Sequence, residues 1–227
     1  MYKKYIKRIL DIILSLIAII ITLPIFLIVG ILILIFIGQP AIFRQKRPGK
    51  NEKIFTMYKF RTMTNKKDED GNLLPDELRL TKLGKFLRKT SLDEIPEFIN
   101  ILKGDMSLVG PRPMLVRDMI FFDEETLKRQ SVMPGLTGWA QANGRNSINW
   151  DDRFKHDLYY VEHLSLKMDL KVILLTIKTV LKREGIGEDG GDLSIDYGDY
   201  LLKHKRVSKK EYDKKQIEAK KLLEKVK

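Results

Sequence analysis

Two adjacent carboxylates, Asp93 and Glu94, are the residues of this 227-residue sequence whose type and spacing are best suited to chemistry. One carboxylate can attack phosphorus and form an acyl phosphate, while its neighbour helps to bind Mg²⁺. The run Ser91-Leu92-Asp93-Glu94 also matches a capping box, in which the acidic residues only stabilise the start of a helix. Pro96 complicates that cap, because proline fits only within the first turn. The pattern alone leaves both interpretations open.

Basic residues close to the acidic pair could hold phosphate oxygens: Lys85, Arg88, Lys89 and Arg112. Arg112 lies in Gly110-Pro111-Arg112-Pro113, which is either a stiff turn or a rigid mount for an anion-binding arginine. The glycine-rich run from Pro134 to Trp139 could let the backbone approach a ligand, or simply turn. The chain has no cysteine, and its three histidines lack metal-ligand spacing, so carboxylates remain as the candidate metal ligands.

The elements that must position these residues are predicted to be mostly helical, in an α+β fold with short strands. The segment 45–51 reads as a basic turn, and 133–146 as a glycine-rich loop. Alternation predicts a strand over 54–60. Helices are predicted over 78–89, 91–102, 117–128, 151–163 and 169–183, with apolar residues at helical spacing in the first and the last. The apolar stripe of the last helix is typical of core packing and also of a helix that lies on a membrane surface.

The N-terminal segment predicts a membrane anchor. No charged side chain occurs from Ile12 to Phe43, and a helix from Ile9 to Ile37 would be roughly 43 Å long, which exceeds the ~30 Å hydrocarbon core. Basic residues flank both ends, which favours placing both ends on the cytoplasmic side. Pro24 near the middle can kink the helix, and the Thr22 hydroxyl could satisfy a freed carbonyl. These features favour a re-entrant helix, while a tilted single span stays open.

The formal charge of +12 suggests an anionic partner. About +7 lies at each end of the chain, in 1–50 and in 203–227, so the body between them is slightly negative. A nucleic-acid binder would carry its basic patch on the folded domain, whereas basic clusters beside an apolar segment fit anionic lipid head groups. We therefore expect membrane lipids, and no nucleic acid, as partners. The basic tail could equally be a solvated helix.

Five motifs in a fixed order closely resemble the bacterial sugar transferase family, the monotopic phosphoglycosyl transferases, and in particular its small PglC-like members. The resemblance runs from the N-terminus to about Gly187. Its motifs are Tyr58-Lys59-Phe60-Arg61-Thr62-Met63, Leu92-Asp93-Glu94-Ile95-Pro96, Gly104-Asp105-Met106-Ser107-Leu108-Val109-Gly110-Pro111-Arg112-Pro113, Pro134-Gly135-Leu136-Thr137-Gly138-Trp139-Ala140-Gln141 and Asp157-Leu158-Tyr159-Tyr160-Val161.

The resemblance implies transfer of a sugar 1-phosphate from a UDP-sugar to a polyprenyl (undecaprenyl) phosphate, the first membrane step of glycoconjugate assembly. Asp93 would be the nucleophile that displaces UMP and carries the phosphosugar. Glu94 would bind Mg²⁺ with Asp93 and assist proton handling. The expected substrate contacts are Lys59, Arg88, Arg112, Arg145 and Asp169. Glu97 departs from the glutamine that many members have after the proline.

The resemblance also strengthens the re-entrant interpretation of the anchor. It implies a re-entrant helix over 1–43, a catalytic domain over 44–187 on the cytoplasmic face of the bacterial inner membrane, and a basic extension over 188–227. The competing hypothesis is a non-enzymatic membrane scaffold, in which the acidic pair only caps a helix. The sequence does not specify the sugar, the pathway, the role of the tail or the oligomeric state.

Overall fold

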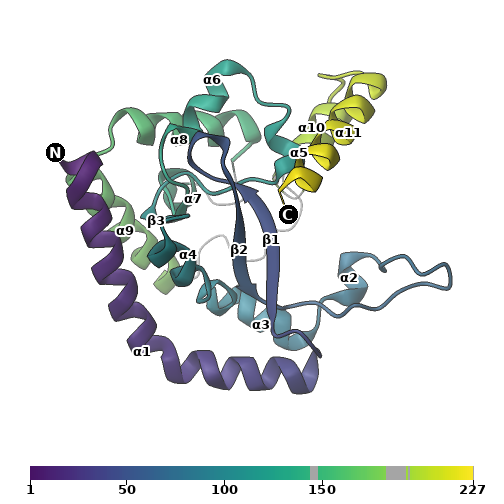
Figure 1. The fold of residues 1–227 in the computed structure, drawn as a ribbon, viewed down its shortest axis with the longest axis horizontal. Helices are drawn as coiled ribbons and strands as arrows, with labels where there is room; N and C mark the ends of the chain where they lie inside the picture. The colour runs from purple at the N-terminus through teal and green to yellow at the C-terminus, as the bar shows by residue number, and fades with distance from the viewer. Residues whose placement is uncertain (144–147, 183–192, 194, 227) are drawn as a thin grey trace.

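The computed structural model describes residues 1–227 except 144–147, 183–192, 194 and 227 (Figure 1). It is mostly helical with short strands, which confirms the predicted fold class at that level.

The N-terminal apolar segment forms one long helix, α1 (Lys7–Phe36), after a short π-helix (Tyr2–Ile6). By length and composition this helix could cross a membrane, because an 18-residue stretch of it has a mean hydropathy of 3.2. Pro24 lies inside α1 and removes a backbone donor, and Figure 1 shows α1 bent into two arms. The Thr22 hydroxyl donates to the carbonyl of Ala18 at 2.7 Å. The carbonyl that Pro24 frees is that of Ile20, so the expected role of Thr22 is wrong.

Polar contacts fasten the first arm of α1 to the rest of the protein. Arg8 donates hydrogen bonds of 2.5 and 2.7 Å to two main-chain carbonyls near the end of α4 (Glu97–Lys103). Asp11 accepts bonds of 3.0 and 2.9 Å from the Ser107 hydroxyl and the next main-chain N–H in β3 (Ser107–Val109). Because Asp11 and the side chain of Ser107 are buried, these bonds are shielded from water and constrain the position of the arm.

Apolar contacts fasten the second arm of α1 to the same domain. Its buried residues Val29 and Ile33, together with Ile37 just after the helix, pack with Phe60, Leu87 and Ile95. Most of the large apolar side chains between the two contact regions are exposed instead: Leu16, Ile17, Ile20, Ile21, Leu23, Ile25, Leu27 and Ile28. An apolar surface of this extent is typical of a segment that lipid covers.

An antiparallel hairpin follows the second arm of α1. β1 (Ile42–Pro48) pairs with β2 (Ile54–Phe60) from Ile42 opposite Phe60 to Pro48 opposite Ile54. The predicted strand over 54–60 is confirmed, whereas the predicted turn over 45–51 is largely strand β1. The reversal instead occupies Gly49 and a 3₁₀ turn (Lys50–Glu52). The basic Pro-Gly composition of 45–51 concealed the strand, because its side chains alternate poorly between polar and apolar.

A short parallel pair joins two of the sequence motifs. β3 pairs with β4 (Gly135–Thr137), with Ser107 opposite Gly135 and Val109 opposite Thr137. A Cβ at Gly135 would lie 2.1 Å from the N atom of Gly110, so the two backbones meet only because both motifs place glycine there. The predicted loop over 133–146 is therefore partly β4 and α7 (Trp139–Asn143).

Three predicted helices are each broken into two pieces. Residues 78–89 fall in α2 (Asp76–Arg79) and α3 (Lys82–Lys89), 91–102 in a 3₁₀ turn (Leu92–Glu94) and α4, and 117–128 largely in α5 (Val116–Met119) and α6 (Glu124–Leu127), with a 3₁₀ turn (Lys128–Ser131) following. The side chains of Thr81 and Asp123 cap new helices by accepting main-chain N–H bonds, which explains two of the breaks. Helix α4 ends at Gly104 as predicted.

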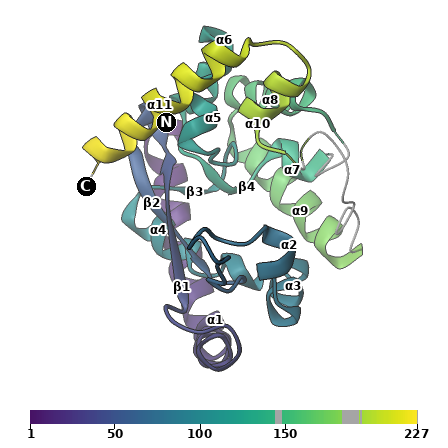
Figure 2. The same ribbon diagram turned by 90° about the vertical axis from the view of Figure 1, so that its right-hand side faces the viewer.

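The two long C-terminal predictions are confirmed as α8 (Trp150–Glu162) and α9 (Leu166–Lys182). Beyond them, α10 (Tyr197–Lys203) and α11 (Lys209–Lys225) cover an aromatic cluster. In it, Tyr197 and Tyr200 pack with Phe122, Trp150 and Phe154. Figure 2 shows α11 on the side of the molecule opposite the second arm of α1. Helices α10 and α11 of the C-terminal tail thus pack on the same aromatic cluster as Phe122, Trp150 and Phe154 of the preceding domain.

A buried ion pair supports the loop that carries Arg112. Arg129 lies 2.7 Å from Asp157, with side-chain exposures of 2% and 1%, and also donates a 2.7 Å bond to the main-chain carbonyl of Arg112. Removing one partner of a buried pair leaves an uncompensated charge, which is far more costly than losing a pair at the surface.

We therefore expect Asp157→Ala to lower the free energy of unfolding by about 3–5 kcal/mol. The matched control is Lys155→Ala, which breaks an exposed pair with Asp152 in the same helix and should cost less than about 1 kcal/mol. Denaturant unfolding in detergent measures both variants. An equal loss of unfolding free energy in both variants would show that the buried pair does not stabilise the fold more than the exposed pair does.

Candidate active site

The acidic pair lies on a tight turn between two helices. Asp93 and Glu94 belong to the 3₁₀ turn between α3 and α4. Ser91 has a left-handed backbone (φ 55°) and makes no side-chain cap, so the capping-box interpretation is wrong. The turn presents the Glu94 carboxylate to Lys59 of β2 and to Arg112 of the loop after β3.

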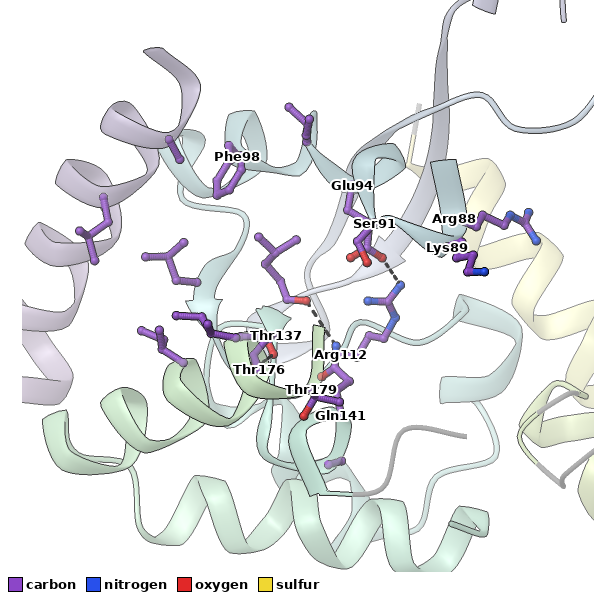
Figure 3. Close-up of a pocket in the computed structure, with 18 of the residues that line it drawn as sticks. Arg88, Lys89, Ser91, Glu94, Phe98, Arg112, Thr137, Gln141, Thr176 and Thr179 are labelled. Carbon is purple, nitrogen blue, oxygen red and sulfur yellow. Dashed lines mark hydrogen bonds and ion pairs between the residues drawn. The ribbon is translucent and has the colours of Figure 1, made fainter. Parts of the chain in front are cut away.

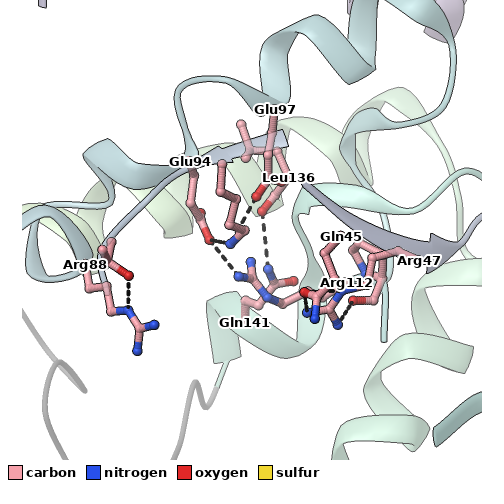
Figure 4. A network of polar contacts seen from close by, with 11 residues as sticks. Gln45, Arg47, Arg88, Glu94, Glu97, Arg112, Leu136 and Gln141 are labelled. Atoms are coloured by element: carbon pink, nitrogen blue, oxygen red, sulfur yellow. Dashed lines mark hydrogen bonds and ion pairs between the residues drawn. The ribbon is translucent and has the colours of Figure 1, made fainter. Parts of the chain in front are cut away.

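Glu94 is the centre of a network of ion pairs (Figure 4). Its Oε1 accepts from Lys59 Nζ at 2.8 Å and from Arg112 Nη2 at 2.6 Å. Lys59 Nζ also lies 3.1 Å from Oε1 of Glu97, although that buried oxygen has no well-aligned hydrogen bond among the described residues. Lys59 thus lies between Glu94 and Glu97 and is closer to Glu94, whereas Arg112 pairs with Glu94.

The network shifts the pKa values of the three acidic residues in different directions. Burial favours the neutral form of Glu94, but the charges of Arg112 and Lys59 outweigh it and hold the pKa of Glu94 well below its usual range. Burial raises the pKa of Glu97 to about 7, against the opposing charge of Lys59. Burial also raises the pKa of Asp93, and the negative charge of Glu94 adds to that effect.

Asp93 lies inside this cluster without taking its cations. It is 8% exposed, and Lys59, Arg112 and Arg88 all act on its charge. The ion pairs of Lys59 and Arg112 among the described residues nevertheless go to Glu94 and Glu97 and not to Asp93. Asp93 is thus the carboxylate that these cations do not neutralise by direct contact.

A cavity of about 1100 Å³ adjoins the network (Figure 3). Ser91 and Glu94, on either side of Asp93, line it. Its lining includes five basic side chains: Lys85, Arg88, Lys89, Arg112 and Arg153. Apolar side chains form another part of its wall: Leu14, Ala18, Phe98, Ile173 and Ile177. The cavity therefore offers both anion-binding and apolar surfaces.

The predicted site residues separate into groups in space. Lys59, Asp93, Glu94 and Arg112 come together, and Arg88 lines the same cavity while donating to the Thr62 hydroxyl at 3.1 Å. Arg145 lies outside the described residues.

Asp169 lies elsewhere, in α9. Its carboxylate is buried and binds Lys7 Nζ at 2.6 Å and the hydroxyls of Tyr2 and Tyr160 at 2.5 and 2.7 Å. Its contacts fasten the start of α1, and a role for it in substrate binding stays a prediction.

Sequence reasoning missed Arg153. It lines the cavity from α8 and lies 5.0 Å from the centre of the Trp150 ring, and burial lowers its pKa to about 10. No motif surrounds it, and only the folded chain brings α8 beside the acidic turn. Glu97 stood out in the sequence only as a departure from the expected glutamine. Its burial and its shared lysine are what make it part of the site.

The chain is similar in sequence to bacterial sugar transferases. Residues 2–183 match the family described as bacterial sugar transferase. An uncharacterized sugar transferase, EpsL of Bacillus subtilis, is 54% identical over 150 residues, which cover 66% of this chain and 74% of the relative.

Two further relatives carry more specific names. The UDP-N-acetylgalactosamine-undecaprenyl-phosphate N-acetylgalactosaminephosphotransferase of Aeromonas hydrophila is 38% identical over 78% of this chain. The UDP-glucose:undecaprenyl-phosphate glucose-1-phosphate transferase of Klebsiella pneumoniae is 40% identical over 75% of it. The matches cover only 44% and 39% of these longer relatives. Since the family match spans most of this chain and includes the acidic turn, the protein belongs to the bacterial sugar transferase family.

Proposed function

We propose that this protein is a phosphoglycosyl transferase that moves a sugar 1-phosphate from a UDP-sugar to a polyprenyl phosphate, with UMP as the leaving group. The observation that carries the proposal is a difference between the two carboxylates of the acidic pair. Glu94 forms ion pairs with Lys59 and Arg112, while Asp93 has neither cation in direct contact. A free carboxylate beside a cation-lined cavity suits attack on a phosphate ester. The undecaprenyl-phosphate transferases among the relatives support the same reaction class.

In the first step, an oxygen of Asp93 attacks the β-phosphorus of the UDP-sugar. The bond from that phosphorus to the bridging oxygen breaks, and UMP leaves with the electron pair. In the second step, a phosphate oxygen of the polyprenyl acceptor attacks the same phosphorus. The acyl-phosphate bond then breaks, which restores the Asp93 carboxylate and releases the sugar linked to the polyprenyl chain through a diphosphate.

The cations of the cavity bind and orient the phosphates. Arg112 is fixed by Glu94 through its side chain and by Arg129 through its main chain, so its guanidinium is preorganised for an anion. Arg88 reaches the cavity from α3, and Lys59 comes from β2. Preorganised charge of this kind lowers the barrier because it need not reorient during the reaction.

Mg²⁺ belongs to the proposal as a cofactor held by Asp93 and Glu94. Among the described residues no group of three or more acidic or histidine side chains could hold a metal. Mg²⁺ usually binds through one or two carboxylates and completes its shell with substrate phosphates and water, so the two carboxylates of Asp93 and Glu94 would suffice as its protein ligands. When bound, the ion would neutralise part of the pyrophosphate charge.

We further propose that α1 is re-entrant and keeps the domain on the cytoplasmic face of the inner membrane. Both arms of α1 bind the same domain, through Arg8 and Asp11 at one end and Val29 and Ile33 at the other. A straight crossing would separate those two ends by the thickness of the membrane. The bend therefore supports a helix that enters and leaves by one leaflet.

Single cysteines at Lys4 and Arg44 test this topology, since the chain has no cysteine of its own. We expect a membrane-impermeant thiol reagent to label both from the cytoplasmic face in oriented vesicles. Glu69→Cys, in an exposed loop of the domain, marks that face as a control. Labelling of the two positions from opposite faces would establish a span.

The role of Asp93 is tested without the lipid acceptor. With UDP-sugar alone, the enzyme should release UMP and retain labelled sugar phosphate, and Asp93→Asn should lower UMP release by more than about 10³-fold. Asp70→Asn, in an exposed loop, is the matched control and should react normally. Label retained by Asp93→Asn would contradict its assignment as nucleophile, and full cellular function of that variant would favour a scaffold.

Glu97 should make stability depend on pH. Its folded pKa of about 7 lies above its unfolded value of about 4.5, so the stabilisation by its neutral form is complete below pH 4.5 and is lost as pH rises through 7. We expect Glu97→Gln to be more stable than the wild type at pH 8, relative to pH 4.5, on the order of 1–3 kcal/mol. Denaturant unfolding at both pH values measures this, with the exposed Glu69→Gln as control. Identical pH profiles for wild type and Glu97→Gln would refute the shift.

A further inference from the structure

We infer that the apolar part of the cavity, between the first arm of α1 and helix α9, receives the isoprenoid chain of the acceptor. This inference rests on the proposed function and assigns to the second substrate a place that the reaction alone does not specify.

The composition of the cavity wall matches an amphipathic ligand. Leu14 and Ala18 of α1 and Ile173 and Ile177 of α9 line the apolar side, while Arg88 and Arg112 line the polar side. Figure 3 shows Phe98 on the side of the cavity nearer α1, and Arg88 and Lys89 on the side away from it. A polyprenyl phosphate has a matching division, with its anionic head at one end and its hydrocarbon chain beyond it. The uracil, ribose and sugar of a UDP-sugar each carry hydrogen-bonding groups, which would lose their partners against such a wall.

The apolar wall is continuous with surface that faces outward. Leu14 and Ile177 line the cavity and are also 42% and 52% exposed, so the apolar wall reaches the protein surface at both residues. On either side, Ile17 of α1 and Leu174 of α9 extend the apolar surface, with exposures of 47% and 66%. A lipid chain could thus pass from the bilayer into the cavity without crossing a polar rim.

The two helices that form this opening are held at a defined separation. Lys7 of α1 and Asp169 of α9 form an ion pair of 2.6 Å with side-chain exposures of 11% and 7%, near the start of both helices. On α9, Thr176 lines the cavity and contacts the Thr137 hydroxyl of β4 at 2.7 Å. The groove is therefore built into the fold and need not be formed by the ligand.

Ala18→Phe tests the assignment by filling the groove. We expect the KM for undecaprenyl phosphate to rise about tenfold, while the KM for dimethylallyl phosphate, whose chain has only five carbons, changes less than about twofold. UMP release from UDP-sugar without acceptor should stay unchanged, which also shows that the variant is folded. The control Ile20→Phe places the same side chain on α1 at a residue that is 64% exposed and does not line the cavity, and it should behave as wild type.

An unchanged KM for undecaprenyl phosphate in Ala18→Phe, or an equal rise for both acceptors, would overturn the assignment of the chain to this groove. Failure of the wild type to release UMP would instead overturn the proposed function.

A second measurement does not depend on a variant. A polyprenyl phosphate with a photoreactive group on its chain should crosslink the wild-type protein at 14–18 or 173–177, and excess undecaprenyl phosphate should prevent the reaction. Crosslinks confined to other segments would overturn the inference. Equal protection by phosphatidylglycerol vesicles would also overturn it, because the groove would then accept ordinary phospholipid.

Discussion

The contact of Glu94 with both Lys59 and Arg112 is the interaction on which the rest of the structure depends. A carboxylate in this position would become neutral without compensation, because burial penalises its charge. The two cations keep it ionised, and in doing so they are themselves fixed beside Asp93. Lys59 arrives on the hairpin from β1 and β2, and Arg112 on the loop after β3. The fold is thus arranged to deliver two cations to one turn.

The supports of this contact extend to the membrane helix. The Arg112 loop rests on the buried Arg129–Asp157 pair, and β3 before it binds Asp11 of α1. Arg8 of α1 binds the carbonyls at the end of α4, whose first residue is Glu97. α1 is therefore a structural part of the site as well as an anchor. A displacement of its first arm would move α4 and β3, which adjoin the acidic turn and the Arg112 loop.

Much of the site could be predicted because its residues lie in compact motifs. Lys59, Asp93, Glu94 and Arg112 each stand in a run whose composition is specific, and the apolar stripe of 169–183 identified α9. The breaks in the other helices depend on single caps, such as Thr81 and Asp123, which a periodic pattern does not weigh strongly enough. β1 and Arg153 depend on partners far away in the sequence, so no local signal marks them.

Formation of a covalent phosphosugar on Asp93 is the central claim, and mass spectrometry of the intact protein and its peptides tests it most directly. After incubation with UDP-sugar and no acceptor, the account predicts a mass increase of one sugar phosphate on the peptide that contains Asp93, and its loss when undecaprenyl phosphate is added. An adduct on Glu94, or UMP release that occurs only with acceptor present and without any adduct, would contradict the account.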